Sequence, residues 1–106
     1  DMLFIDAPIL MREVQDLLWE GSCRKLQQVI LVRPAAGHLI QGSGGLRKLR
    51  WDLPAAGNRG SRRTIYYWDS PSNTIYLLLA YKKSKREDLT QDQLKTLSEL
   101  LNEWLE

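Results

Sequence analysis

The hydrophobic residues of the chain follow two periods, helical near both ends and alternating in the middle. The first residues, Met2 to Ile5, form a short apolar run that predicts a strand. Asp6 is a suitable cap for a helix after it, and Pro8 is tolerated in the first turn of that helix. Helical spacing then continues through five residues: Ile9, Leu10, Val14, Leu17 and Leu18. The pattern predicts a strand followed by a helix that ends near residues 19–21.

A second helix is expected directly after the first. Ser22 is a suitable cap for it, and Leu26, Val29 and Ile30 recur at helical spacing. The helix should end before Pro34, because a proline pushes the preceding residue out of the α region. The short gap between the two helices predicts an antiparallel helix pair.

The middle of the chain changes to a period of two, which is typical of strands. Small residues dominate the segment 34–45, which we interpret as a loop. Three strands are predicted after it: Leu46 to Leu53, Arg62 to Asp69 and Thr74 to Lys82. The short connections between them predict an antiparallel meander. Its last strand is apolar on both faces from Ile75 to Ala80, so we expect it in the centre of a sheet.

A last helix is predicted near the end of the chain. Thr90 and Gln93 have the spacing of a capping box. An apolar stripe follows at helical spacing: Leu94, Leu97, Leu101 and Trp104. A chain of 106 residues is long enough to bury one core. We therefore expect residues 1–106 to form one small α+β domain, in which an N-terminal strand and a helix pair pack on an antiparallel β-meander that is followed by a C-terminal helix.

The composition excludes several kinds of site. Cys23 is the only cysteine and His38 the only histidine, which leaves no internal disulfide and no Cys-rich zinc site, so we expect no metal and no cofactor. The longest apolar runs fall far short of the roughly 20 residues that a spanning helix needs. No secretion signal is evident, so we expect a cytoplasmic protein without a membrane partner. Asp1 before Met2 is compatible with a trimmed start.

Charge is distributed unevenly along the chain. The net charge is +2, but residues 47–63 hold six basic residues and one acidic residue, whereas residues 87–106 hold one basic residue and six acidic ones. A local concentration of positive charge is typical of a site that binds a polyanion. The total charge is too small for strong electrostatic binding to a polyanion over a large surface. This favours a local phosphate site.

Strand alternation gathers several of these cations. It places Lys48 and Arg50 on one face of their strand and Arg47 on the other. If the faces of the three strands coincide, five side chains surround one spot: Lys48, Arg50, Arg63, Tyr81 and Lys83. Around a phosphodiester, arginine forks hold the oxygens, an aromatic ring stacks on a base, and a lysine among cations can act as a general base. The alternative is that these charges only solvate an exposed sheet face or protect an edge strand.

Three other features have plainer explanations. His38 stands in a loop of small residues without a second histidine, which favours a loop polar residue over a general acid. Cys23 is interpreted as a packing thiol rather than a reactive one. The glycines at residues 42–45 precede a strand and lack the Gly-Lys-[Ser/Thr] of a P-loop, so they free the chain to enter the strand.

Three blocks of the sequence resemble one known family. The blocks are Gly44 to Trp51 (GGLRKLRW), Gly57 to Trp68 (GNRGSRRTIYYW) and Tyr81 to Thr90 (YKKSKREDLT). Together they resemble the RelE/ParE superfamily of bacterial toxins, specifically its HigB-like branch, and the order of the expected elements extends the resemblance over nearly the whole chain. The resemblance implies a RelE-like fold. It also implies a type II toxin that cleaves messenger RNA in the ribosomal A site without a metal, by attack of the 2′-hydroxyl on the adjacent phosphate.

The resemblance further implies roles for particular residues. Lys48 is expected as the general base, Arg63 as the group that stabilises negative charge in the transition state, and Arg50 with Lys83 as phosphate holders. Further substrate contacts are expected from five residues: Arg47, Arg59, Tyr67, Tyr81 and Lys82. The implied partners are a helix-turn-helix antitoxin of the HigA type, the ribosome and mRNA, with DNA bound only through the antitoxin.

The sequence departs from the family pattern in two places. Asn58 and Ser61 interrupt a block that commonly reads Gly-Lys-Arg-Gly-Gly, and Ser84 with Lys85 replaces the end of the usual Lys-Asn-Glu. Ser84 lacks the contacts of a larger polar side chain, so the group that protonates the leaving oxygen is unassigned. The alternative functions are a non-catalytic toxin of the ParE type that binds DNA gyrase, and a catalytically damaged relative that still binds its antitoxin. The four expected catalytic cations favour the nuclease, because a protein-binding toxin would not require them.

Overall fold

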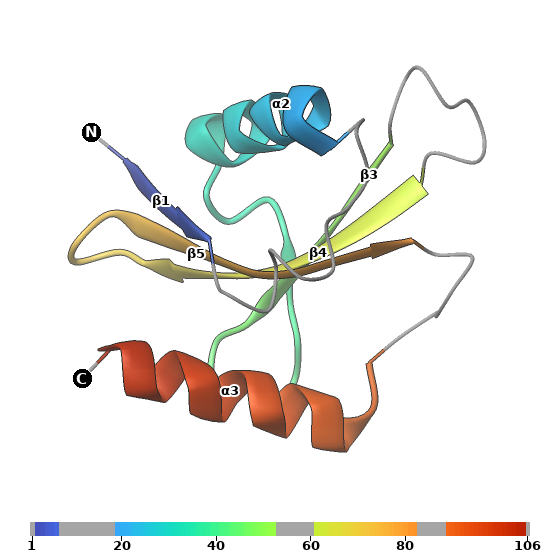
Figure 1. Ribbon diagram of the computed structural model, residues 1–106. Coiled ribbons are helices and arrows are strands. Elements are labelled where there is room, and N and C mark those ends of the chain that lie inside the picture. Colours follow the sequence, from blue (N-terminus) through green and yellow to red (C-terminus); the bar gives the residue numbers. More distant parts are fainter. Residues whose placement is uncertain (1, 7–18, 53–60, 83–88, 106) are drawn as a thin grey trace.

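The described part of the chain is built around one five-stranded sheet with a helix on each face (Figure 1). The computed structural model describes residues 2–6, 19–52, 61–82 and 89–105. The elements are β1 (Leu3–Asp6), α2 (Trp19–Val32), β2 (His38–Leu39), β3 (Arg47–Asp52), β4 (Ser61–Asp69), β5 (Thr74–Lys82) and α3 (Gln91–Leu105). In Figure 1, α2 lies above the sheet and α3 below it.

The strand order is β1-β5-β4-β3-β2. The neighbouring pairs from β5 to β2 are antiparallel, so the expected meander of β3, β4 and β5 is confirmed. The expected N-terminal strand is confirmed as β1, which pairs in parallel with β5 and makes the sheet mixed. β5 therefore has a neighbour on both sides, and the residues from Leu77 to Tyr81 are all buried. This confirms its predicted central position.

The boundaries of α2 differ from the prediction. The helix begins at Trp19 and continues through Ser22, so the predicted cap at Ser22 is wrong. A glycine inside a helix costs about 1 kcal/mol, and the burial of Leu26 and Ile30 against the core outweighs that cost. The helix ends at Val32, as expected from Pro34. The first predicted helix falls on residues 7–18, outside the described residues.

The segment after α2 is more ordered than the predicted loop, because residues 38 and 39 form β2 and pair with β3. At the other end of the chain, the predicted capping box of α3 is confirmed. The Gln93 amide donates to the Thr90 hydroxyl at 3.1 Å, and the Thr90 amide donates to the Gln93 side chain at 2.9 Å. The stripe of α3 is buried at three positions: Leu94, Leu97 and Leu101.

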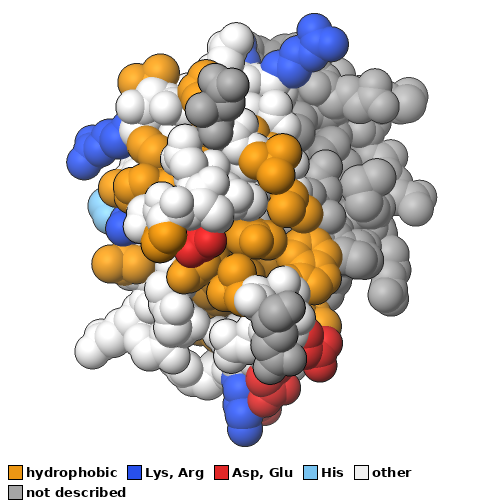
Figure 2. All heavy atoms as spheres, turned by 90° about the vertical axis from the view of Figure 1, so that its left-hand side faces the viewer, with side chains coloured by type: hydrophobic (Ala, Val, Ile, Leu, Met, Phe, Trp, Pro, Cys, Tyr) orange, Lys and Arg blue, Asp and Glu red, His pale blue; other side chains and the backbone are white. Residues whose placement is uncertain are grey.

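The two ends of the sheet carry different surfaces. The β4–β5 turn and both chain termini lie at the left of Figure 1, and Figure 2 shows hydrophobic side chains gathering in the middle of that face. β5 runs away from this end and reaches Lys82 at the opposite end, near the start of α3 (Figure 1). No helix in the described residues has the length and apolar character to cross a membrane.

Candidate functional site

The strand register brings three of the expected site residues into one row. Arg50 pairs with Arg63 across β3 and β4, and Arg63 pairs with Tyr81 across β4 and β5. Direct partners in antiparallel strands project from the same face of the sheet. Lys48 lies two residues from Arg50 on β3 and therefore shares this face. The condition that the faces of the three strands coincide is therefore met for these four residues.

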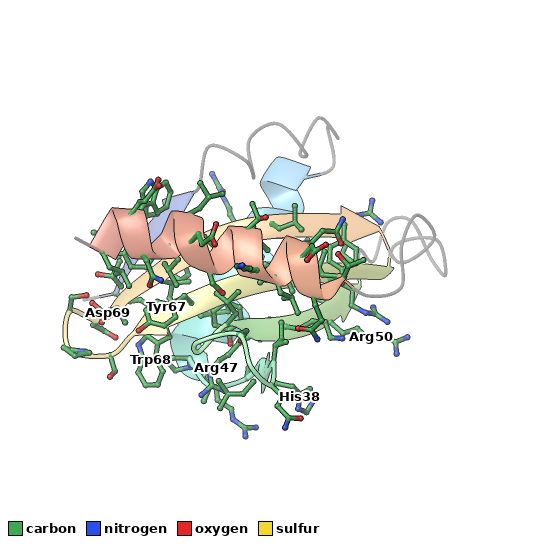
Figure 3. The ribbon with its side chains drawn as sticks, turned by 90° about the horizontal axis from the view of Figure 1, so that it is seen from below. His38, Arg47, Arg50, Tyr67, Trp68 and Asp69 are labelled. Atoms are coloured by element: carbon green, nitrogen blue, oxygen red, sulfur yellow. The ribbon has the colours of Figure 1, made fainter. Side chains whose placement is uncertain are left out.

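This face is the one that α3 covers. The same face carries Tyr76, and the ring of Tyr76 lies 5.8 Å from the ring of Trp104 on α3. In the middle of the face, Ile65 and Leu79 are buried. Lys48 and Arg63 on this face are half-buried. Arg50 is exposed and is labelled in Figure 3. We call Lys48, Arg50 and Arg63 the cationic cluster.

The cationic cluster brings like charges to facing positions on two neighbouring strands. Arg50 and Arg63 are directly opposite each other, and like charges in that position destabilise a sheet. Arg63 lies on an inner strand with neighbours on both sides, so protection of a sheet edge does not account for it. A phosphate group held between the two guanidinium groups would relieve their repulsion.

Arg47, an expected substrate contact, lies on the opposite face of the sheet. It pairs with Tyr66, and its guanidinium group donates to the Gly37 carbonyl at 2.9 Å and to the Ala35 carbonyl at 3.5 Å. The sheet separates its side chain from the cationic cluster, as strand alternation predicts. Its expected contact with the substrate stays a prediction. Its physical role in the structure is to hold the chain just before β2.

Tyr67 shares the face of the cationic cluster but lies farther along β4. Its position is about 13 Å from Arg63 along the strand. The ring packs 6.4 Å from the ring of Tyr76, and a Cβ at Gly45 would lie 3.0 Å from it. Gly45 has a φ of 108°, which only glycine adopts without strain. Tyr67 therefore packs beside the loop that leads into β3.

The remaining expected residues are one buried tyrosine, one lysine known through its backbone pairing, and two residues outside the described part of the chain. Tyr81 is only 5% exposed, so its ring is part of the core cluster, and its stacking on a base stays a prediction. Lys82 pairs with Arg62 through the backbone. Arg59 and Lys83 lie outside the described residues, and their expected roles stay predictions.

His38 is the residue whose place the sequence reasoning missed. It lies on β2 directly opposite Lys48, so its side chain projects from the face of the cationic cluster. The side chain is exposed, and Figure 3 shows it at the β2 edge of the sheet, near the end that holds Arg50. A strand of two residues is too short to show a period, so the sequence carried no signal for this placement.

The backbone on both sides of His38 is held by hydrogen bonds. The Gly37 amide donates to the Tyr66 hydroxyl at 2.8 Å, and that hydroxyl donates to the Pro34 carbonyl at 2.7 Å. On the other side, the Ile40 amide donates to the Leu46 carbonyl at 2.9 Å. Burial raises the pKa of Tyr66 from 10.0, against the opposing effects of the hydrogen bond from Gly37 and the charge of Arg47. The phenol therefore stays protonated and keeps its hydrogen bond to Pro34.

Comparison with known proteins shows the fold. No family model matches the sequence. Among solved structures, the chain is similar to the E. coli toxin RelE in the free state, in a form with two arginines changed to alanine. The TM-score is 0.59 at 11% sequence identity, and the match covers 94% of this chain and 96% of that chain. The described chain therefore has a RelE-like fold, as its sequence blocks led us to expect.

Proposed function

We propose that this protein is the toxin of a type II toxin-antitoxin system and acts as a ribosome-dependent mRNA endoribonuclease. The observation that carries the proposal is the direct pairing of Arg50 with Arg63 on the face that also holds Lys48. The structural likeness to the E. coli toxin RelE supports the toxin class. The sequence blocks around the cationic cluster support the HigB-like branch, with residues 1–106 as the toxin domain.

The cationic cluster has the groups that such a cleavage needs. The guanidinium groups of Arg50 and Arg63 would hold the non-bridging oxygens of one phosphate. Lys48 would take the proton of the adjacent 2′-hydroxyl, whose oxygen then attacks the phosphorus. As the bond to the 5′-oxygen breaks, negative charge grows on the phosphate oxygens, and Arg63 would stabilise it. The products are a 2′,3′-cyclic phosphate and a 5′-hydroxyl end.

The proposal includes no metal and no other cofactor. The guanidinium groups of Arg50 and Arg63 would supply the charge stabilisation that divalent metals supply in other nucleases. Lys83 is proposed as a further phosphate contact, and Arg59, Lys82, Tyr67 and Tyr81 as further contacts to the RNA, on the basis of the sequence resemblance. Arg47 has a different role in this proposal, because it holds the Gly37 carbonyl on the opposite face.

The proposed partners follow from the toxin class. A helix-turn-helix antitoxin of the HigA type would neutralise the protein and carry any contact with DNA. The ribosome would present the mRNA, which places the activity in the cytoplasm. A total net charge of only +2 is consistent with a substrate presented by another particle rather than captured along its length.

The test is to induce the protein in growing cells and map new 5′ ends on matched transcripts with and without a start codon. We expect cuts at codon positions in the translated transcript only, and none with Arg63→Ala. Arg24→Ala is the matched control, because Arg24 is an exposed arginine of α2 outside the cationic cluster. Growth arrest with intact messages would contradict the proposed nuclease activity. A change in DNA supercoiling in the same cells would then favour the gyrase-binding alternative.

A further inference from the structure

Cleavage by the proposed route needs two proton transfers, and the cationic cluster accounts for only one of them. The 2′-hydroxyl must lose a proton, and the departing 5′-oxygen must gain one. Lys48 is occupied by the first task. The other two members of the cluster are arginines, a side chain that binds and stabilises anions and is not expected to donate a proton. The cationic cluster as defined above therefore lacks a proton donor.

His38 lies beside the group that takes the first proton. It is the direct partner of Lys48, and direct partners have Cβ atoms about 4.5–5.5 Å apart. Arg50 is its diagonal neighbour on β3, at about 7–8 Å. The attacking and leaving oxygens stand on opposite sides of one phosphorus, so the base and the acid must flank the same phosphate. The register of β2 with β3 places His38 and Lys48 next to each other on one face, so a phosphate held between the ends of their side chains would have one on each side.

The support of β2 also distinguishes His38 from an ordinary surface histidine. Gly37, directly before it, is held at its amide by Tyr66 and at its carbonyl by Arg47. A Cβ at Gly37 would lie 2.8 Å from the Tyr66 ring, so this close approach requires a glycine. An exposed side chain that only interacts with solvent needs no such anchoring. A proton donor does, because small displacements of a catalytic group lower the rate steeply.

We propose that His38 is the general acid of the cleavage, an inference that rests on the proposed function. The protonated imidazole donates its proton to the 5′-oxygen as the bond between phosphorus and that oxygen breaks. The electron pair of the broken bond remains on the 5′-oxygen and binds the donated proton. The 2′-oxygen, after losing its proton to Lys48, forms the new bond to phosphorus. The imidazole and the lysine then exchange their protons with water, so no further reactant is consumed.

A sulfur substitution in the substrate tests this role. Two mRNAs are compared on the ribosome. In the oxygen substrate, the linkage to be cleaved has its normal 5′-oxygen. In the sulfur substrate, a sulfur atom replaces that oxygen. A thiolate leaves without protonation, so a general acid is needed only for the oxygen substrate. We expect His38→Ala to slow single-turnover cleavage of the oxygen substrate about 10²- to 10⁴-fold. The same variant should cleave the sulfur substrate at close to the wild-type rate.

Two controls complete the comparison. Lys48→Ala should be slow on both substrates, because the 2′-hydroxyl still needs a base. Gln41→Ala, an exposed neighbour of β2, should match the wild type on both. An equal loss of His38→Ala on both substrates, or no loss on either, overturns the role of His38. If the wild type cleaves neither substrate although both mRNAs are intact, the proposed function fails, and the role of His38 fails with it.

Discussion

Arg50 and Arg63 are direct partners across β3 and β4, so two guanidinium groups project side by side from one face of the sheet. Like charges in facing positions disfavour strand pairing, and the same concentration of positive charge attracts an anion. We therefore expect these two charges to lower the free energy of unfolding and to increase the binding of phosphate. This expectation leads to the first prediction.

Replacing Arg50 with glutamine should stabilise the protein while impairing its activity. The change removes one of the two facing charges, which is expected to raise the free energy of unfolding by about 0.2–1 kcal/mol at low salt. The gain should shrink as salt screens the repulsion. Urea unfolding at two salt concentrations measures both effects, with Arg24→Gln as the control. A loss of stability at low salt would contradict the proposed repulsion.

Replacing Arg63 with alanine should abolish growth arrest. The residue is proposed to stabilise charge on the phosphate, so its loss removes an interaction that matters mainly in the transition state. Arg63→Lys keeps the charge but loses the fork of donors, and we expect partial toxicity from it. Colony formation after induction, at protein levels matched by immunoblot, measures the outcome.

Antitoxin binding provides the folding control for that experiment. Arg63→Ala should still be captured by the cognate antitoxin, because the residue is proposed to contact RNA. Full toxicity of Arg63→Ala at equal expression would remove Arg63 from the proposed mechanism.

Replacing Gly37 with alanine should disturb the support of β2. The added Cβ would lie 2.8 Å from the Tyr66 ring and 3.1 Å from the Arg47 side chain. Crowding of this kind in a packed region is expected to cost about 2 kcal/mol. Thermal unfolding measures the loss, and Ala36→Ser serves as a neighbouring control of small size change. An unchanged unfolding midpoint would show that the segment before β2 is not tightly held.

Alkaline pH should destabilise the protein through Tyr66. Burial raises the pKa of Tyr66 above 10.0 in the folded state, so the unfolded chain loses the phenolic proton first as the pH rises. The stabilisation is fully present below pH 10 and is lost as the pH rises through the folded-state value. Tyr66→Phe should remove this component, so the difference in unfolding free energy between wild type and variant should narrow above about pH 10.

The same variant should be less stable than the wild type at neutral pH. Without the hydroxyl, the buried Gly37 amide and the Pro34 carbonyl lose their partner, which typically costs about 1–3 kcal/mol. Denaturant unfolding between pH 7 and pH 11 measures both parts of the prediction. A constant difference across that range would contradict the role of Tyr66 ionisation.

Local patterns predicted most of the secondary structure around the site. β3, β4 and β5 were readable because each strand is six to nine residues long and rich in apolar, β-branched or aromatic residues. The capping box of α3 was equally readable, because its two hydrogen bonds join residues three positions apart. The prediction of a cap at Ser22 was wrong, because α2 already begins at Trp19 and Ser22 lies inside it.

The sequence by itself determined which side chains share a face within each strand, because alternation is a property of the extended backbone. It placed Lys48 with Arg50, and Arg47 opposite them. Only the tertiary structure decided that Arg50 faces Arg63 and that His38 faces Lys48, because register depends on contacts between distant segments. The two-residue β2 has no period of its own and exists through pairing with β3 and the hydrogen bonds at Gly37. The candidate proton donor is therefore a product of tertiary packing.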